Sequence, residues 1–246
     1  SRIFLVSFLF IILLKKPKLK PYFVLMKKSL QKVIFKKLFQ LGFPTALQMI
    51  FEGGIFTATV LLAGTLGTNA QAANQIALNL ASMTFMIAVG LGVTATIRIG
   101  NQKGKKDYVS LKRIAYSIFI QVFIIMFFFA LGFILLKDFL PSIYIDDIYV
   151  VQIASQLLII AAVFQLSDGL QVTILGALRG MQDVWIPTLI CFIAYWVIGF
   201  PISFFIGKED VLGSIGIWLG LLAGLTSSAI MLFFRFNYLT KKMLSP

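Results

Sequence analysis

Six long apolar runs constrain the fold of this 246-residue chain more than any other feature. They cover residues 38–64, 75–97, 114–136, 149–178, 185–206 and 214–234. About 20 apolar residues are enough for a helix to cross the hydrocarbon core of a bilayer. Stretches such as FIIMFFFALGFILL lack the alternation of a membrane β-barrel, and a helix satisfies its own backbone groups in lipid. The sequence therefore predicts an all-α polytopic membrane protein, with six spanning helices.

The overall composition excludes the usual classes of soluble protein. Hydrophobic residues make up 59% of the chain and charged residues only 13%, whereas soluble domains carry roughly 25% charged residues. The net charge of +13 raises the question of a nucleic-acid partner. Such modules display their charge on a water-soluble face, for which this chain has too few polar residues. We therefore expect membrane lipids around the helices, and no nucleic acid.

The 22 basic residues indicate how the helices are oriented in the membrane. Nine lysines lie within residues 15–37, six basic residues lie within 98–113, and four more are Arg179, Arg235, Lys241 and Lys242. These 19 residues fall on one side of the predicted membrane, and five of the nine acidic residues fall in loops on the other. Because loops rich in lysine and arginine stay in the cytoplasm, the pattern predicts a cytoplasmic C-terminus.

The sequence lacks the residue types on which many metal and catalytic sites depend. Histidine is absent, and Cys191 is the single cysteine. These counts exclude zinc sites built from cysteine and histidine, Ser-His-Asp triads and Cys-His dyads. The sequence therefore predicts no site of these kinds.

Two acidic residues, Glu52 and Asp168, lie inside apolar runs rather than in loops. Glu52 lies roughly 14 residues, about 21 Å, from the cytoplasmic start of its run, and Asp168 lies about 11 residues, roughly 16 Å, from Arg179. A charge near the bilayer midplane costs about 2.5–3.5 kcal/mol or more, so such residues are paired, protonated or in contact with water. One interpretation is a carboxylic acid hydrogen-bonded between helices. The other, which two carboxyls at similar depth favour, is a site for protons or a small cation such as sodium.

The helix faces that carry the two carboxyls also carry amide and aromatic side chains. A further polar stripe follows one face of the 75–97 run. Such stripes either hold neighbouring helices together or supply neutral oxygens to a small cation. The predicted supporting contacts are Gln48, Asn79, Phe164 and Gln171.

Glycine and proline positions predict close packing and a bend near the end of the chain. Gly216, Gly220 and Gly224 recur every four residues, which is typical of a helix face that packs closely against a neighbour. Pro201 falls inside the 185–206 run and should bend that helix. The bend is either a fixed shape or part of a gate.

Five segments together make the sequence resemble a known transporter family. They are LGFPTALQMIFEGGIF (41–56), AGTLGTNAQAANQIALNLASMTFM (63–86), GLGVTATIRIGNQKGKKD (90–107), FQLSDGLQVTILGALRGMQDVWIP (164–187) and YWVIGFPISF (195–204). In order and spacing they resemble the C-terminal half of a MATE (multidrug and toxic compound extrusion) transporter of the NorM-like kind. The resemblance covers about residues 38–240.

The resemblance implies an architecture and an activity. Family members have twelve helices in two lobes around a central cleft, and they expel cationic amphipathic drugs by alternating access in exchange for protons or sodium. The resemblance implies that Glu52 and Asp168 bind the coupling ion, in a protein of the bacterial inner membrane. It also implies that the protein is not an enzyme and holds no metal or cofactor apart from that ion. Phe164 stands where the family often has tyrosine, and Thr57 lies where some branches carry a second glutamate. These departures leave the choice between proton and sodium open.

The same resemblance divides the chain into four parts. We expect the end of a preceding helix at 1–14, a basic cytoplasmic linker at 15–37, the six-helix lobe at 38–240 and a cytoplasmic tail at 241–246. The N-terminal lobe would then be missing from this chain.

Other functions compete with drug efflux at this point. An inactive or decayed fragment that needs a partner lobe would show the same pattern. A flippase for lipid-linked sugars would need basic residues within the cleft, whereas the arginines here lie at or beyond the predicted helix ends. An intramembrane protease would need two catalytic aspartates, and only one aspartate lies in a predicted helix.

Overall fold

The computed structural model describes residues 6–8, 10, 12 and 32–244. The chain divides into two compact units, Ser1–Phe43 and Pro44–Pro246. In the first unit the described residues are helical. Much of the predicted helix end at 1–14, and most of the predicted linker at 15–37, lies outside the described residues. The second unit contains the elements that form the functional site.

The described residues form helices and no strand. The long helices are α3 (Lys32–Thr65), α4 (Thr68–Gly104), α5 (Tyr108–Leu135), α7 (Ile148–Gly180) and α10 (Gly213–Leu244). A sixth rod is composite and consists of α8 (Trp185–Phe192), the π-helix η2 (Ile193–Gly199) and α9 (Phe200–Ile206), while the short α6 (Phe139–Ser142) links α5 to α7. In this part of the chain, six rods are long and apolar enough to cross a membrane. The predicted all-α polytopic fold is therefore confirmed.

Several helices extend beyond the apolar runs that predict them. Helix α4 covers 68–104 around the predicted run at 75–97, and α10 continues to Leu244, past the predicted start of a tail at 241. Residues 32–37 of the predicted linker belong to α3. Hydropathy marks only the part of a helix that matches the hydrocarbon core, whereas backbone hydrogen bonding continues into the polar residues at either end.

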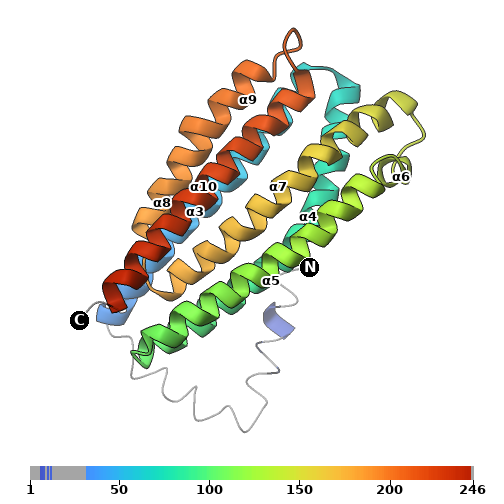
Figure 1. Cartoon of the computed structure of the whole chain (residues 1–246). Helices are drawn as coiled ribbons and strands as arrows, with labels where there is room; N and C mark the ends of the chain where they lie inside the picture. The colour runs from blue at the N-terminus through green and yellow to red at the C-terminus, as the bar shows by residue number, and fades with distance from the viewer. Residues whose placement is uncertain (1–5, 9, 11, 13–31, 245–246) are drawn as a thin grey trace. The chain divides into compact units, whose positions relative to one another are not determined.

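Helix α7 is the central element of the second unit and packs against α4, α5 and α10 (Figure 1). Its contact with α4 is close because glycines face each other across it. A Cβ atom on Gly176 would collide with the backbone of Gly92, and one on Gly180 would collide with the backbone of Thr96 and Gly100. Thr96 reinforces the crossing by donating to the carbonyl of Gly176 at 2.9 Å. Small residues allow helix backbones in a membrane to approach in this way.

The glycine repeat of α10 packs against the composite rod, as the sequence predicts. A Cβ atom on Gly220 would collide with the backbone of Ser203, and one on Gly224 would lie 3.2 Å from the Cα atom of Gly199. The rod contains a π-helix, η2, directly before Pro201, at the position where the sequence predicts a bend. Proline lacks the N–H group of a regular helix and crowds the preceding turn, and wider π turns are one way to absorb that irregularity.

One end of the second unit collects the α4–α5 turn, the α7–α8 turn and the end of α10 (Figure 1). Arg235 of α10 forms an ion pair with Asp183 of the α7–α8 turn, with Nε–Oδ2 and Nη2–Oδ1 distances of 2.9 and 3.1 Å. Asp107 caps α5 by accepting a hydrogen bond from the backbone N–H of Ser110 at 3.0 Å. Hydrogen bonds from the side chain and the backbone of Ser110 lower the pKa of Asp107. The last turns of α4, α7 and α10 at this end also carry basic residues, among them Lys103, Arg179 and Lys241.

Candidate functional site

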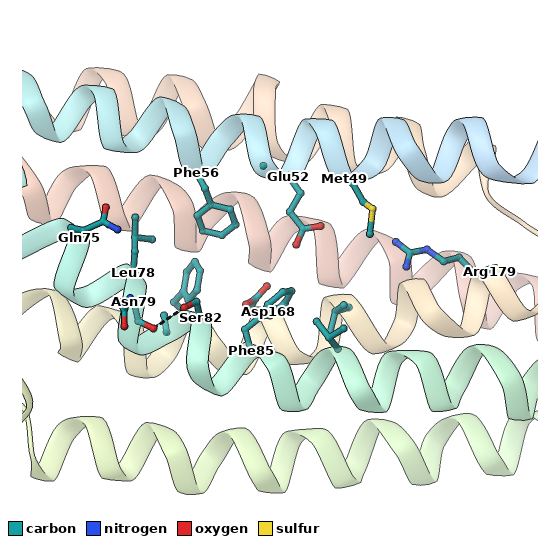
Figure 2. A pocket seen from close by; sticks show the side chains of 15 residues that line it. Met49, Glu52, Phe56, Gln75, Leu78, Asn79, Ser82, Phe85, Asp168 and Arg179 are labelled. Carbon is teal, nitrogen blue, oxygen red and sulfur yellow. Dashed lines mark hydrogen bonds between the residues drawn. The ribbon is translucent and has the colours of Figure 1, made fainter. Parts of the chain in front are cut away.

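A cavity of about 560 Å³ lies between α3, α4 and α7 (Figure 2). This volume falls within the range of small-molecule sites, which are mostly apolar and carry a few polar groups. Its apolar wall includes the side chains of Met49, Phe56, Phe85 and Phe164. Its polar lining residues are Glu52, Gln75, Asn79, Ser82, Asp168 and Arg179.

Both predicted carboxyls line this cavity, and they project from facing walls. Glu52 extends from α3 and Asp168 from α7, and Figure 2 shows both carboxyl groups in the space between these helices. Glu52 is half-buried, whereas Asp168 is only 4% exposed. The Oδ1 atom of Asp168 is buried and has no hydrogen-bond partner within the described residues. A buried carboxyl oxygen in this situation needs a proton, a water molecule or a cation.

The polar face of α7 around Asp168 meets three neighbours because its residues spread over a wide arc. Gln165 accepts a hydrogen bond from Thr84 of α4 at 2.8 Å. Gln171 is fully buried and lies against Cys191 of α8 rather than in the cavity. Steps of three residues backward and forward turn the helix by about 60° to either side. Asp168 is therefore the member of this arc that faces the cavity, whereas Gln171, a predicted supporting contact, does not line it.

Phe164 and Asn79, two of the predicted supporting contacts, line the cavity. Phe164 is 2% exposed, and its ring lies 6.1 Å from that of Phe56 and 5.5 Å from that of Trp218. The side-chain carbonyl of Asn79 accepts a hydrogen bond from the Tyr144 hydroxyl at 3.0 Å. Phe164 thus contributes a buried aromatic ring to the lining, and Asn79 contributes an amide.

Arg179 lines the same cavity, and the sequence analysis missed this position. Its Nη2 atom donates to the Oε1 atom of Gln48 at 3.1 Å. The guanidinium in Figure 2 points along α3 toward Glu52. Arg179 follows Asp168 by eleven residues, which is close to three full turns, so both residues lie on nearly the same face of α7. This spacing was the signal in the sequence that could have placed Arg179 in the cavity.

Gln48 anchors Arg179 instead of lining the cavity. Its Nε2 atom donates to the carbonyl of Val184 at 3.2 Å and to the hydroxyl of Thr188 at 3.1 Å, which leaves its carbonyl oxygen to Arg179. Gln48, another of the predicted supporting contacts, therefore contacts Arg179 and does not line the cavity. Arg179 does lie at a helix end, in the last turn of α7, as the sequence predicts. Its long side chain nevertheless lines the cavity, which the sequence analysis does not anticipate.

The donor atoms of the site suit protons or a small monovalent cation. Among the described residues, no group of three or more cysteine or acidic side chains gathers in one place. The cavity combines two carboxyls with neutral oxygens of Asn79 and Ser82 on α4. Hard cations prefer oxygen ligands of this kind, and protons need only the carboxyls.

Comparisons with known proteins agree with the resemblance found in the sequence. The family model MatE matches residues 44–205. A probable multidrug resistance protein NorM of Xylella fastidiosa is 38% identical over 208 residues, which cover 85% of this chain and 44% of the relative. The multidrug resistance protein MdtK of Proteus mirabilis is 38% identical over 201 residues, which cover 80% of this chain and 44% of that protein. This chain thus spans less than half the length of these curated relatives.

Solved structures share the fold at low sequence identity. A MATE transporter crystallised in a bent conformation superposes with a TM-score of 0.81 at 16% identity, over 89% of this chain and 48% of that chain. An outward-facing multidrug resistance transporter of the MATE family gives a TM-score of 0.79 at 15% identity, over 87% of this chain and 48% of that chain. These partial matches fit the C-terminal half of such a transporter. On the family model, the close relatives and the shared fold, the chain belongs to the MatE family.

Proposed function

We propose that this chain is one lobe of a secondary antiporter that expels organic cations in exchange for protons or sodium. The observation that carries the proposal is the placement of Glu52 and Asp168 on facing walls of one cavity, on helices long enough to span a membrane. Carboxyls at membrane depth are costly unless they serve an ion or a proton. Asp168, with a buried oxygen that lacks a hydrogen-bond partner in the described part of the chain, is the stronger ligand candidate.

The same cavity accounts for the exchange of an organic cation against the coupling ion. A coupling ion neutralises Glu52 and Asp168, and an organic cation competes for the same negative charge. The rings of Phe56, Phe85 and Phe164 provide an apolar wall for the rest of an amphipathic molecule, and aromatic faces attract cations directly. Occupation by the ion therefore lowers the affinity for the drug, and occupation by the drug lowers the affinity for the ion. This mutual exclusion is the physical basis of antiport.

Transport by alternating access requires a second wall, since one lobe alone encloses no path across the membrane. The chain spans 44% of the length of its NorM relatives, and we propose that an N-terminal lobe completes the cleft. We further propose that the protein lies in the bacterial inner membrane, in contact with lipid, with its C-terminus in the cytoplasm. The gathering of basic residues from α4, α7 and α10 at one end supports this orientation.

Substitution of the two carboxyls tests the proposal. We expect Glu52→Gln and Asp168→Asn, made in the intact reading frame, to lower efflux of a cationic dye by about tenfold or more while membrane insertion stays normal. Glu209→Gln removes a carboxylate from an exposed loop and should leave efflux unchanged. Dye accumulation measured with and without sodium at fixed pH selects the coupling ion. Undiminished efflux in both cavity variants would contradict the assignment.

Arg179 supports a second candidate, a flippase for lipid-linked sugars. A guanidinium in the cavity suits a phosphate group, which the two carboxyls would repel. The dye assay separates the two functions, because a flippase would show no dye efflux in the unsubstituted protein.

Expression of the 246-residue chain by itself tests the remaining alternative, that this chain is inactive without a partner lobe. If dye efflux appears only when this chain is expressed together with the proposed N-terminal lobe, the lobe described here works only with that partner.

A further inference from the structure

Arg179 is the one basic residue that lines the cavity in the described part of the chain. No carboxylate of the described residues forms an ion pair with its guanidinium, although Glu52 lies within electrostatic range. Its Nε atom is buried and has no hydrogen-bond partner among these residues, and its Nη2 atom is held only by the neutral amide of Gln48. A cation in apolar surroundings is thus held in the structure by a neutral partner, beside a cavity that contains two carboxyls.

The amide that holds Arg179 lies one helical turn from Glu52. Gln48 and Glu52 are four residues apart on α3, so their side chains share a face with Cβ atoms roughly 5–6 Å apart. Gln48 is itself fixed by Val184 and Thr188 of the neighbouring segment. A neutral amide and a carboxyl, both able to accept a hydrogen bond from the guanidinium, therefore lie one turn apart on α3. Figure 2 shows the guanidinium pointing toward Glu52. A cavity of about 560 Å³ leaves the arginine side chain room to turn from one acceptor to the other.

We propose that Arg179 is a tethered counter-ion that competes with mobile cations for Glu52. This inference rests on the proposed antiport function. It states how the charge of Glu52 is neutralised when no mobile cation is bound. When neither drug nor coupling ion is bound, the guanidinium turns toward Glu52 and neutralises it. When a mobile cation enters, the guanidinium returns to Gln48, the position seen in the structure. An uncompensated carboxylate is costly in a membrane interior, so the tethered cation allows the empty site to exist and weakens the hold on any cation that must be released.

A purely structural role for Arg179 makes a different prediction. In that case Arg179 would serve to tie the end of α7 to α3 through Gln48. Replacing it would lower stability without tightening cation binding, and replacing Gln48 would act in the same direction. Competition for Glu52 requires the two substitutions to act in opposite directions, because Gln48 draws the guanidinium away from the carboxyl.

The test measures equilibrium binding of tetraphenylphosphonium to the purified intact protein, with and without sodium at fixed pH. We expect Arg179→Gln to bind this cation about tenfold more tightly, since its internal competitor is lost. Arg179→Lys keeps the charge and should bind within about twofold of the unsubstituted protein. Gln48→Met removes the anchor at similar volume and should bind several-fold more weakly, whereas the double variant should match Arg179→Gln. Arg98→Gln removes the same charge from an exposed face of α4 and serves as the control.

The outcomes separate this inference from the function on which it rests. If the unsubstituted protein binds no tetraphenylphosphonium and exports no dye, the antiport proposal fails and this inference fails with it. If it binds the cation and Arg179→Gln binds equally or more weakly, the antiport proposal stands and the tethered counter-ion is rejected. A loss of affinity in Gln48→Met that persists in the double variant also rejects it. Should Gln48→Met not fold, the pair Arg179→Gln and Arg179→Lys decides alone.

Discussion

The two walls that carry the carboxyls are built in different ways. Helix α7, which carries Asp168, buries twenty of its 33 residues and meets α4 backbone to backbone at the Gly92–Gly176 contact. Helix α3, which carries Glu52, buries five residues, and its contacts with the rest of the second unit are made mainly by side chains. These contacts include the hydrogen bonds of Gln48 and the ring contact of Phe51 with Phe192 at 5.1 Å.

This difference means that one carboxyl is fixed and the other is adjustable. A glycine contact between backbones tolerates almost no displacement, because there is no side chain to rearrange. A contact between long side chains tolerates small shifts through changes of rotamer. The distance between Asp168 and Glu52 is therefore set by the position of α3. In the proposed antiport, a cation that binds both carboxyls would draw α3 toward α7, and this movement would link the occupation of the site to the conformation of the lobe.

The largest effect on stability should come from adding a methyl group where α7, the fixed wall, meets the backbone of α4. Gly176→Ala would place a Cβ atom against the carbonyl group and Cα atom of Gly92, well inside van der Waals contact. Neither backbone can yield without separating α4 from α7, so we expect a loss of about 3 kcal/mol in stability. Thermal unfolding of the purified protein in detergent measures the change.

Gly90→Ala is the matched control for this substitution. Gly90 lies on α4 only two residues from Gly92, and a Cβ atom there meets nothing within 4 Å. Alanine is a better helix former than glycine, so this variant should be neutral or slightly stabilised. An equal loss of stability in Gly90→Ala and Gly176→Ala would show that the α4–α7 contact is not the rigid element described above.

A smaller effect is expected behind the fixed wall, where Trp218 of α10 donates its indole N–H to Asn74 of α4 at 2.9 Å. Trp218 is fully buried, and its ring packs on Phe164. Trp218→Phe removes the donor and leaves the Asn74 carbonyl buried without it, so we expect a loss of about 2 kcal/mol. Trp196→Phe provides the comparison, because the Nε1 atom of Trp196 has no hydrogen-bond partner within the described residues, and this variant should lose less stability in the same unfolding measurement.

The main features of both walls could be predicted from the sequence because each depends on one strong physical cost. Lipid requires long apolar helices, which made the six runs visible. The cost of a buried charge singled out Glu52 and Asp168, and the structure places both in one cavity. The spacing of Gly216, Gly220 and Gly224 predicted close packing of α10, which the structure confirms.

Other features could not be predicted because they depend on where a side chain turns after it leaves its helix. Gln171 shares an arc with Asp168, yet it turns toward Cys191 because α8 lies on that side. Gln48 shares a face with Glu52, yet it turns toward Thr188. Arg179 lies at the end of α7, and only the reach of its long side chain brings it into the cavity. Faces of helices can be read from periodicity, whereas neighbours are set by tertiary packing.

The smallest effect should come from the same kind of substitution at the adjustable wall. A Cβ atom on Gly54 of α3 would lie 2.9 Å from the indole Cζ2 atom of Trp196, a contact closer than normal. The obstacle is a half-buried side chain and not a backbone, and α3 can move by a few tenths of an ångström to relieve it. Alanine also gains helix propensity over glycine, so we expect Gly54→Ala to change stability by less than about 1 kcal/mol. Gly53→Ala, where a Cβ atom meets nothing within 4 Å, gives the propensity gain alone for comparison. If Gly54→Ala destabilises the protein as much as Gly176→Ala does, α3 is held as rigidly as α7, and the proposed cation site then has two fixed walls.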